Sequence, residues 1–446
     1  MKQKILIALL LFTSLLNAQD APKSYSFSLN QAVEHALINN YKSINASRDI
    51  ESAKQRKLET TAAGLPQINA GLDYSKNFIF TQQGVTGNAF NPGGDPNSIS
   101  TIAFGTKNSL NSRLTLSQLI FDGSYIVALQ ASKTYLQFYQ NSKIKTDNEI
   151  REMVTNYYGN VLLAEESSAI LEKNKTALQK TLFEAQETYK NGFIEEETME
   201  QLQITLASIT SSLSNATRLV DISKKILNIT VGLDINDHLI LTEKLDVLTV
   251  KNVDLNFENT DFDVTNTIDY QIAENFKEQR RLEYKLQKAT YLPSLAANAN
   301  FGYNAFSNDF SFTNQNQKWN NYSNLGVSLN VPVFSSFGKK AKNQQAKIAY
   351  QQAKTQLTEA EQMLKLQHSS AKSNYEYAIE QYATSKSNLK LAERIENKQQ
   401  IKFKEGLSTS FEFTEAQRQL YAAQQNYLQS MIDVINKKTA LDKITN

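Results

Sequence analysis

The same segment occurs twice in this chain, and each copy begins an unusually long module. Each module is predicted to contain a strand, a loop, a second strand, a very long helix, a tight turn and another helix. The first strands match through LPQINAGLDY at Leu65 and LPSLAANANF at Leu292. The second strands match through Phe121 and Phe334, and the helical turns through Gly192 and Gly406. The offset is 227 residues at the first pair but 213 and 214 at the later pairs. The first copy is therefore predicted to carry about 14 extra residues in the loop between its strands.

The N-terminus has the pattern of a secretory signal peptide. Lys2 and Lys4 precede an apolar run from 5 to 16, and Asn17-Ala18 is a plausible cleavage point, so residues 1–18 are predicted to be removed on export. A membrane anchor is the alternative, but about 20 apolar residues are needed to span a bilayer.

Composition argues against several functions. Without Lys2 and Lys4, the 47 Lys and Arg fall to 45, equal to the 45 Asp and Glu, so no basic field favours nucleic acid. Cysteine is absent, which excludes disulfides and thiolate metal sites. His35, His238 and His368 have no metal-ligand spacing, and neither a Gly-x-Ser-x-Gly nor a Walker motif occurs. We predict no enzyme activity and no cofactor or metal site.

Four short segments alternate apolar and polar residues as strands do. They are predicted at 66–80, 109–121, 293–306 and 322–334, with one apolar face and one face of Asn, Ser and Gly. An ordinary half-buried sheet is one interpretation. A water-filled membrane barrel is the other, favoured because the strands are long enough to cross a membrane at a tilt. Four strands cannot close a wide channel, so several chains would have to contribute to one barrel.

The loops between the paired strands differ in length. The segment 81–108 contains several Gly and Pro residues and is predicted to be a long external loop. The segment 307–321 is shorter and holds Trp319, interpreted as an aromatic residue at a membrane interface.

The rest of the chain is predicted to be helical, because it holds few of the 15 Gly and 6 Pro residues. The first repeat, 19–230, has predicted helices at 29–63, 124–189 and 195–230; the second, 264–446, has them at 268–291, 339–404 and 409–442. Helices of about 66 residues would be about 100 Å long. Their stripes of Ala, Ser and Tyr indicate coiled-coil packing, and their polar remaining faces suit the wall of a hollow cylinder.

Local signals mark the ends of these elements. Ser28 and Gln31 form a predicted capping box at the first helix. Pro66 and Pro293 are the predicted helix-to-strand transitions, because proline lacks an N–H and disfavours a helical residue before it. Residues 231–263, rich in Asp, Asn and Thr, are predicted to form a mixed connector between the repeats.

These features together resemble the TolC-like outer-membrane efflux factors over essentially the whole mature chain. The matching marks are the Leu-Pro pairs at 65 and 292, the strand ends LIFDG at 119 and VPVF at 331, and the turns Tyr189-x-x-Gly192 and Phe403-x-x-Gly406. The resemblance implies a mainly α protein with membrane β structure: a homotrimer with four strands per protomer in one 12-stranded β-barrel in the outer membrane. A periplasmic α-helical barrel with a mixed α/β equatorial collar would continue it.

The resemblance also implies a function and its residues. It implies a passive exit duct of a tripartite efflux or type I secretion system, working with a periplasmic adaptor and an inner-membrane pump. Gly192-Phe193 and Gly406-Leu407 correspond to the adaptor-docking tip, and Glu412 and Glu415 to an acidic ring at the pore entrance. In a trimer, mutual repulsion would raise the pKa of some of these carboxyls.

Two alternatives stay open at this stage. Glu412 and Glu415 can instead be residues of an exposed helix start, where carboxylates interact favourably with the helix dipole. Ser408 stands where the family often has a basic residue that latches the entrance. For the whole protein, the alternative is a structural periplasmic coiled-coil protein without a channel. The transported substrate is not encoded in any motif found.

Overall fold

The computed structural model describes residues 23–90, 92–253 and 262–445; the predicted signal peptide lies outside them. The chain divides into two units. The helical unit consists of Met1–Glu51, Phe138–Glu274 and Thr355–Asn446, and the sheet unit consists of Ser52–Gln137 and Asn275–Lys354. Each unit is assembled from segments of both repeats.

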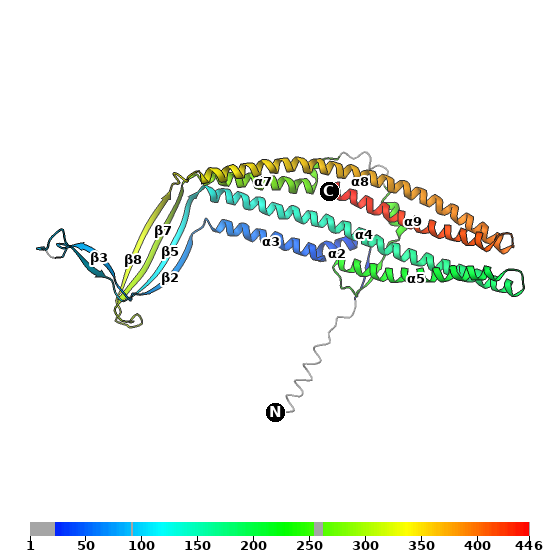
Figure 1. Ribbon diagram of the computed structural model, residues 1–446, viewed down its shortest axis with the longest axis horizontal. Coiled ribbons are helices and arrows are strands. Elements are labelled where there is room, and N and C mark those ends of the chain that lie inside the picture. The colour runs from blue at the N-terminus through cyan, green and yellow to red at the C-terminus, as the bar shows by residue number, and fades with distance from the viewer. Residues whose placement is uncertain (1–22, 91, 254–261, 446) are drawn as a thin grey trace, which may run out of the picture. The chain divides into compact units, whose positions relative to one another are not determined.

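Most of the described residues are helical (Figure 1). The α-helices are α2 (Leu29–Asn39), α3 (Tyr41–Ala62), α4 (Gly123–Lys190), α5 (Glu196–Val231), α6 (Leu245–Lys251), α7 (Ile268–Ala289), α8 (Gly338–Lys404) and α9 (Ser410–Thr445), with a short 3-10 helix at Val264–Asn266. The two long helices, α4 and α8, contain 68 and 67 residues without a proline. None of the described helices is both long and apolar enough to cross a membrane.

The predicted single helix 29–63 is wrong, because the chain breaks at Asn40. Its backbone is extended, with φ −65° and ψ 135°. The Asn40 side chain donates to the carbonyl of Thr230 at 2.7 Å and accepts from the N–H of Lys42 at 2.8 Å. These contacts, one of them with α5, outweigh local helix propensity. The capping box at the start of α2 is confirmed, since the side chains of Ser28 and Gln31 each accept from the other's backbone N–H.

The sheet unit contains a four-stranded antiparallel sheet in the order β2–β5–β7–β8 (Figure 1). Its strands are β2 (Gln67–Lys76), β5 (Asn108–Asp122), β7 (Ser294–Ser307) and β8 (Trp319–Asn330). The two repeats therefore meet in the middle of the sheet, where β5 pairs with β7. The two edges, β2 and β8, each pair on one side only among the described strands.

The register confirms that the sheet has two chemically different faces. On the apolar face, one row of paired residues is Ile68, Leu116, Ala299 and Leu325. On the polar face, the adjacent row is Asn69, Thr115, Asn300 and Asn324. Side-chain hydrogen bonds of 2.8 Å join Thr115 to Asn300 and Asn300 to Asn324. A bulge between Leu119 and Phe121 then shifts the register, so that Phe121 pairs with Leu295.

The strand ends and loops differ from the sequence prediction. β2 ends at Lys76 instead of 80, and β8 ends at Asn330 instead of 334, just before Val331-Pro332. The predicted loop 81–108 contains a separate hairpin, β3 (Thr81–Thr86) with β4 (Ile99–Phe104), which accounts for the extra residues of the first repeat. Trp319 is not in a loop but is the first residue of β8.

The helical unit has its main apolar core where the connector meets the helices. A parallel pair that the sequence did not predict joins β1 (Ser24–Phe27) to β6 (His238–Leu241). The core beneath it includes Ala36, Ile150, Val154, Tyr158, Leu227, Val231 and Ile432. Tyr158 anchors this region, because its hydroxyl donates to the Phe27 carbonyl at 3.1 Å. The connector 231–263 thus contains both a strand and a helix, β6 and α6; its residues 254–261 are outside the described part.

Candidate functional site

Two helix ends in the helical unit are closed by the same backbone motif, once in each repeat. At the end of α4, Gly192 donates to the Tyr189 carbonyl at 2.8 Å and Phe193 donates to Thr188 at 3.2 Å. At the end of α8, Gly406 donates to Phe403 at 3.1 Å and Leu407 to Lys402 at 2.8 Å. These are Schellman motifs, which require a left-handed residue at the penultimate position.

Glycine supplies that left-handed backbone at both turns. Gly192 has φ +77° and Gly406 has φ +69°, and a Cβ at either position would meet nothing within 4 Å. A side chain there would therefore strain the backbone without colliding with another group. The structure places both predicted tip glycines at open turns, and their role in docking stays a prediction.

The residues after these glycines expose apolar surface. Phe193, Leu407 and Phe411 have exposed fractions of 80%, 77% and 70%. A cavity of about 650 Å³ lies between the two turns, lined among others by Glu184, Thr188, Phe193, Phe403 and Lys404. Exposed large apolar side chains beside a cavity are typical of surfaces that contact another protein. We call the turns at Gly192 and Gly406, with these three apolar residues, the tip.

Glu412 lies in the first turn of α9 and completes a capping box that the sequence analysis did not identify. Its carboxylate accepts from the Ser408 hydroxyl at 2.8 Å and the Thr409 N–H at 3.0 Å, while the Thr409 hydroxyl accepts from the Glu412 N–H at 3.2 Å. The Ser408 hydroxyl, followed by the Thr409 contacts, lowers the pKa of Glu412. Within one chain, the helix-start interpretation of Glu412 thus has direct support, and Glu412 remains ionised and exposed.

Glu415 differs from Glu412 because an arginine pairs with it. Arg418 donates to the two carboxylate oxygens of Glu415 through Nε at 2.9 Å and Nη2 at 2.8 Å. This bidentate pair lowers the pKa of Glu415 and cancels much of its charge. The sequence prediction of an acidic ring omitted Arg418, although the spacing of three residues on a helix could have indicated the pair.

The turn at Gly192 joins α4 and α5 into one helical hairpin, and the turn at Gly406 joins α8 and α9 into another. The two hairpins contact each other near the tip. Phe413 of α9 is fully buried against Leu178, Leu202 and Ile209 of α4 and α5. Its ring stacks on Phe403 at 5.1 Å between centroids. Polar contacts continue the junction: Lys404 pairs with Glu184 at 3.0 Å, Ser410 donates to Gln201 at 2.8 Å, and Asn174 donates to Gln424 at 2.8 Å. The tip is therefore held by contacts between the two repeats.

A half-buried carboxyl lies within this junction and was not predicted. Burial raises the pKa of Glu396 on α8 above its usual 4.5. Tyr421 on α9 has its pKa raised to about 12, first by burial and then by the charge of Glu396. The buried side chain of Gln417, one helical turn before Tyr421, has its Oε1 without a hydrogen-bond partner among the described residues. Only the packing of α9 on the other helices buries these groups, so no motif indicated them.

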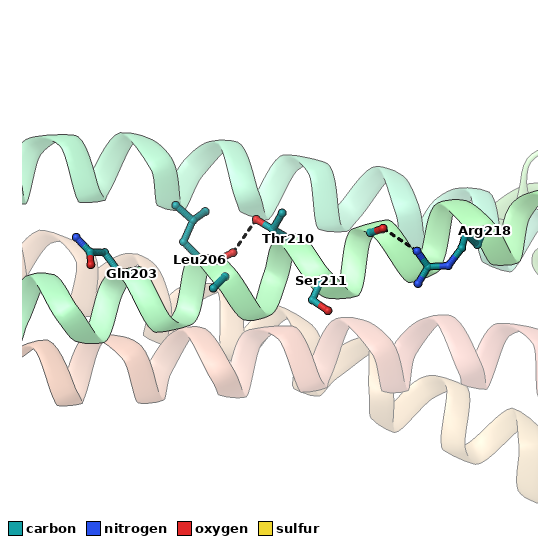
Figure 2. A pocket seen from close by; sticks show the side chains of 7 residues that line it. Gln203, Leu206, Thr210, Ser211 and Arg218 are labelled. Carbon is teal, nitrogen blue, oxygen red and sulfur yellow. Dashed lines mark hydrogen bonds between the residues drawn. The ribbon is translucent and has the colours of Figure 1, made fainter.

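A second surface feature lies on α5. A groove of about 680 Å³ is lined by Gln203, Leu206, Ala207, Thr210, Ser211, Ser214 and Arg218 (Figure 2). The polar side chains fold back on their own helix, since Thr210 donates to the Leu206 carbonyl and Arg218 to the Ser214 hydroxyl, both at 2.8 Å. Four of the lining residues, Ala207, Thr210, Ser211 and Ser214, are small.

The helix-to-strand transitions lie in the sheet unit. Pro66 and Pro293 each occupy the position immediately before a strand, β2 and β7 respectively. The helices end at Ala62 and Ala289, one and two residues before the predicted ends at 63 and 291, and a short turn follows. In the described residues, no group of three or more His, Asp or Glu is arranged to hold a metal ion.

Sequence comparison finds a family similarity within the second repeat. Residues 270–446 match the family described as "Outer membrane efflux protein". Over this segment the chain is similar to that family. The matched region begins in α7 and includes β7, β8, α8 and α9, so it contains Pro293, Gly406, Glu412 and Glu415. A search of curated proteins found no match.

Solved structures are similar to this chain over nearly its whole length. CusC, studied as a transmembrane channel, has a TM-score of 0.74 with 15% identity, covering 97% of this chain and 95% of its own. VceC of Vibrio cholerae, an outer membrane protein, has a TM-score of 0.70 with 16% identity, covering 94% and 95%. The CmeC outer membrane channel of Campylobacter jejuni has a TM-score of 0.71 with 17% identity, covering 94% and 85%. The chain therefore has the fold of the outer membrane efflux channels.

Proposed function

We propose that this protein is the outer-membrane exit duct of a tripartite efflux or type I secretion system. Three copies would each contribute β2, β5, β7 and β8 to one 12-stranded barrel in the outer membrane. The long helices would form a periplasmic tunnel below it. Transport through the duct would be passive, with energy supplied by an inner-membrane pump that a periplasmic adaptor connects to the tip.

The four-stranded sheet carries this proposal. Its apolar face is exposed, with Ile68, Leu72 and Leu325 at 68%, 68% and 79%. Such a face is unfavourable in water but favourable against lipid tails. In lipid, the unpaired backbone groups of the edge strands β2 and β8 would each cost several kcal/mol. Pairing β8 of one copy with β2 of the next removes both edges and leaves the Asn-rich face lining a wet interior.

The helical unit supplies surfaces for the partners. The exposed Phe193, Leu407 and Phe411 at the tip are the proposed adaptor contacts. The groove on α5 is a second proposed contact, because its small residues would allow a helix of the adaptor to pack closely. At the entrance, three copies of Glu412 would present carboxylates without an arginine partner around one axis, whereas Arg418 would neutralise each Glu415.

Channel formation and oligomeric state test the proposal. The mature protein is expected to require detergent for extraction, to run as a trimer that heating dissociates, and to conduct ions in a planar bilayer. A monomer in buffer without detergent would refute the duct and support a periplasmic coiled-coil protein without a channel. Crosslinking in intact cells followed by co-purification would identify the adaptor and pump.

A further inference from the structure

The connection from β8 to α8, residues 331–340, exposes apolar side chains on a strained backbone. Ser336 and Phe337 both have positive φ angles, 48° and 65°. A bulky residue in this region is unusual and strains the backbone. Val333, Phe334 and Phe337 are 90%, 76% and 69% exposed, and the two rings contact each other edge-to-face at 6.0 Å. We call residues 331–340 the second junction, because they join a strand to a long helix in the second repeat.

The equivalent connection in the first repeat is more closely packed, since Phe121, the counterpart of Phe334, is only 40% exposed. Asp122 caps α4 by accepting from the Ser124 N–H at 2.6 Å, and the Tyr125 hydroxyl donates to the Thr61 carbonyl at 3.0 Å. A Cβ at Gly123 would meet the Leu292 side chain at 2.6 Å, whereas one at Gly338 would meet nothing within 4 Å. The exposure of the second junction is therefore not a requirement of the repeat.

The second junction also leads into a basic helix segment. Between Gly338 and Lys354, α8 holds lysines and no acidic residue; they are Lys339, Lys340, Lys342, Lys347 and Lys354. The first repeat has no lysines at the equivalent positions. At the offset of 213 residues, Ile126, Val127 and Leu129 stand where the second repeat has its first three lysines. Lys339 donates to the Thr290 carbonyl at 2.6 Å, at the end of α7, whereas Lys340 lies 5.9 Å from the ring of Phe337.

Assembly would bring a second basic segment to this place. This step rests on the proposed trimer, in which β8 of one copy pairs with β2 of the next. The chain after β8 would then lie near the chain that leads into β2 of the neighbouring copy, which carries Lys54, Arg56 and Lys57 within α3. Like charges brought together at such a boundary repel each other unless an anion lies between them.

We propose that each boundary between copies binds an anionic phospholipid of the periplasmic leaflet. Acyl chains would contact Val333, Phe334 and Phe337, and the phosphate would lie near Lys340 and Lys342 of one copy and Lys57 of the next. Adjacent apolar and cationic side chains match the two parts of such a lipid, and basic residues close to a membrane surface attract anionic headgroups. The lipid would bridge neighbouring copies and stabilise the trimer.

The test uses the full-length trimer in nanodiscs of phosphatidylcholine alone or with phosphatidylglycerol. Wild type is expected to retain phosphatidylglycerol in native mass spectrometry, up to three per trimer, and to dissociate at a higher temperature in the mixed discs. The variant K340Q/K342Q should bind phosphatidylglycerol about 30-fold more weakly, because each lysine near a membrane surface contributes about fivefold to the affinity for an anionic lipid. The control K390Q/K398Q changes two exposed lysines further along the same helix and should leave lipid binding unchanged.

The outcomes separate this inference from the proposed function. Conducting trimers that bind both lipids equally, or that lose no lipid in K340Q/K342Q, would overturn the inference alone. If K340Q/K342Q forms no trimer, K57Q on the other side of the boundary must show the loss of lipid. Binding to isolated peptidoglycan sacculi without any lipid dependence would also overturn it. Absence of trimers and conductance in every lipid would instead refute the duct.

Discussion

Replacing Phe413 by alanine removes an aromatic ring that α9 buries completely between the two hairpins of the tip. The ring stacks on Phe403 and packs against Leu178, Leu202 and Ile209. Truncating a buried phenylalanine in this way costs about 3–5 kcal/mol, because contacts are lost and a cavity remains. Phe411 offers a matched control, since it is the same residue two positions earlier on α9 but is 70% exposed.

Hydrogen exchange measured by mass spectrometry on the trimer would test whether the loss of the Phe413 ring destabilises the tip. In F413A, amides of residues 175–210 and 400–420 should exchange about 100- to 4,000-fold faster, because each 1.4 kcal/mol is a factor of ten. F413L should recover most of the protection, since it retains much of the apolar volume. Exchange near Val154, in the core beneath β1 and β6, should not change.

The control F411A shows whether faster exchange comes from losing the buried ring or from losing any aromatic ring at the tip. F411A should leave exchange at the tip close to wild type and should reduce export if Phe411 contacts the adaptor. Equal acceleration in F411A and F413A would refute the claim that the buried aromatic stack holds the hairpins together. So would a F413A protein with unchanged exchange at the tip.

Three further outcomes are expected. In planar bilayers, E412A should lower cation selectivity and relieve block by multivalent cations, whereas E415A should have a smaller effect because its arginine partner already neutralises it; equal effects would contradict the pairing. G192D and G406D should abolish export while trimers persist on gels, since the turns are open; loss of trimers would make these glycines folding elements. The pKa of Glu396 is raised in the folded state, so thermal stability should fall as pH rises from about 4.5 towards neutral, and E396Q should flatten that dependence in melting experiments.

Features with a local cause were predictable from sequence. The capping box at Ser28 and Gln31 needs only residues three apart, and the alternation of the four strands depends on the two-residue period of a β-strand. The pair formed by Glu415 and Arg418 is equally local, and helical spacing could have revealed it.

Other features were decided by contacts between residues far apart in the chain. Asn40 interrupts a helix-forming sequence because its side chain bonds to the Thr230 carbonyl, 190 residues away. β1 is a strand because it pairs with β6, 214 residues further on. Glu396 looks like any exposed helical glutamate until α9 packs beside it and raises its pKa. The sequence alone therefore determined the repeat, the long helices, the four strands of the main sheet and the turn chemistry, since these follow from neighbouring residues. Only the tertiary structure decided the helix break, the pairing of distant strands and the burial of charge, because each depends on groups brought together by folding.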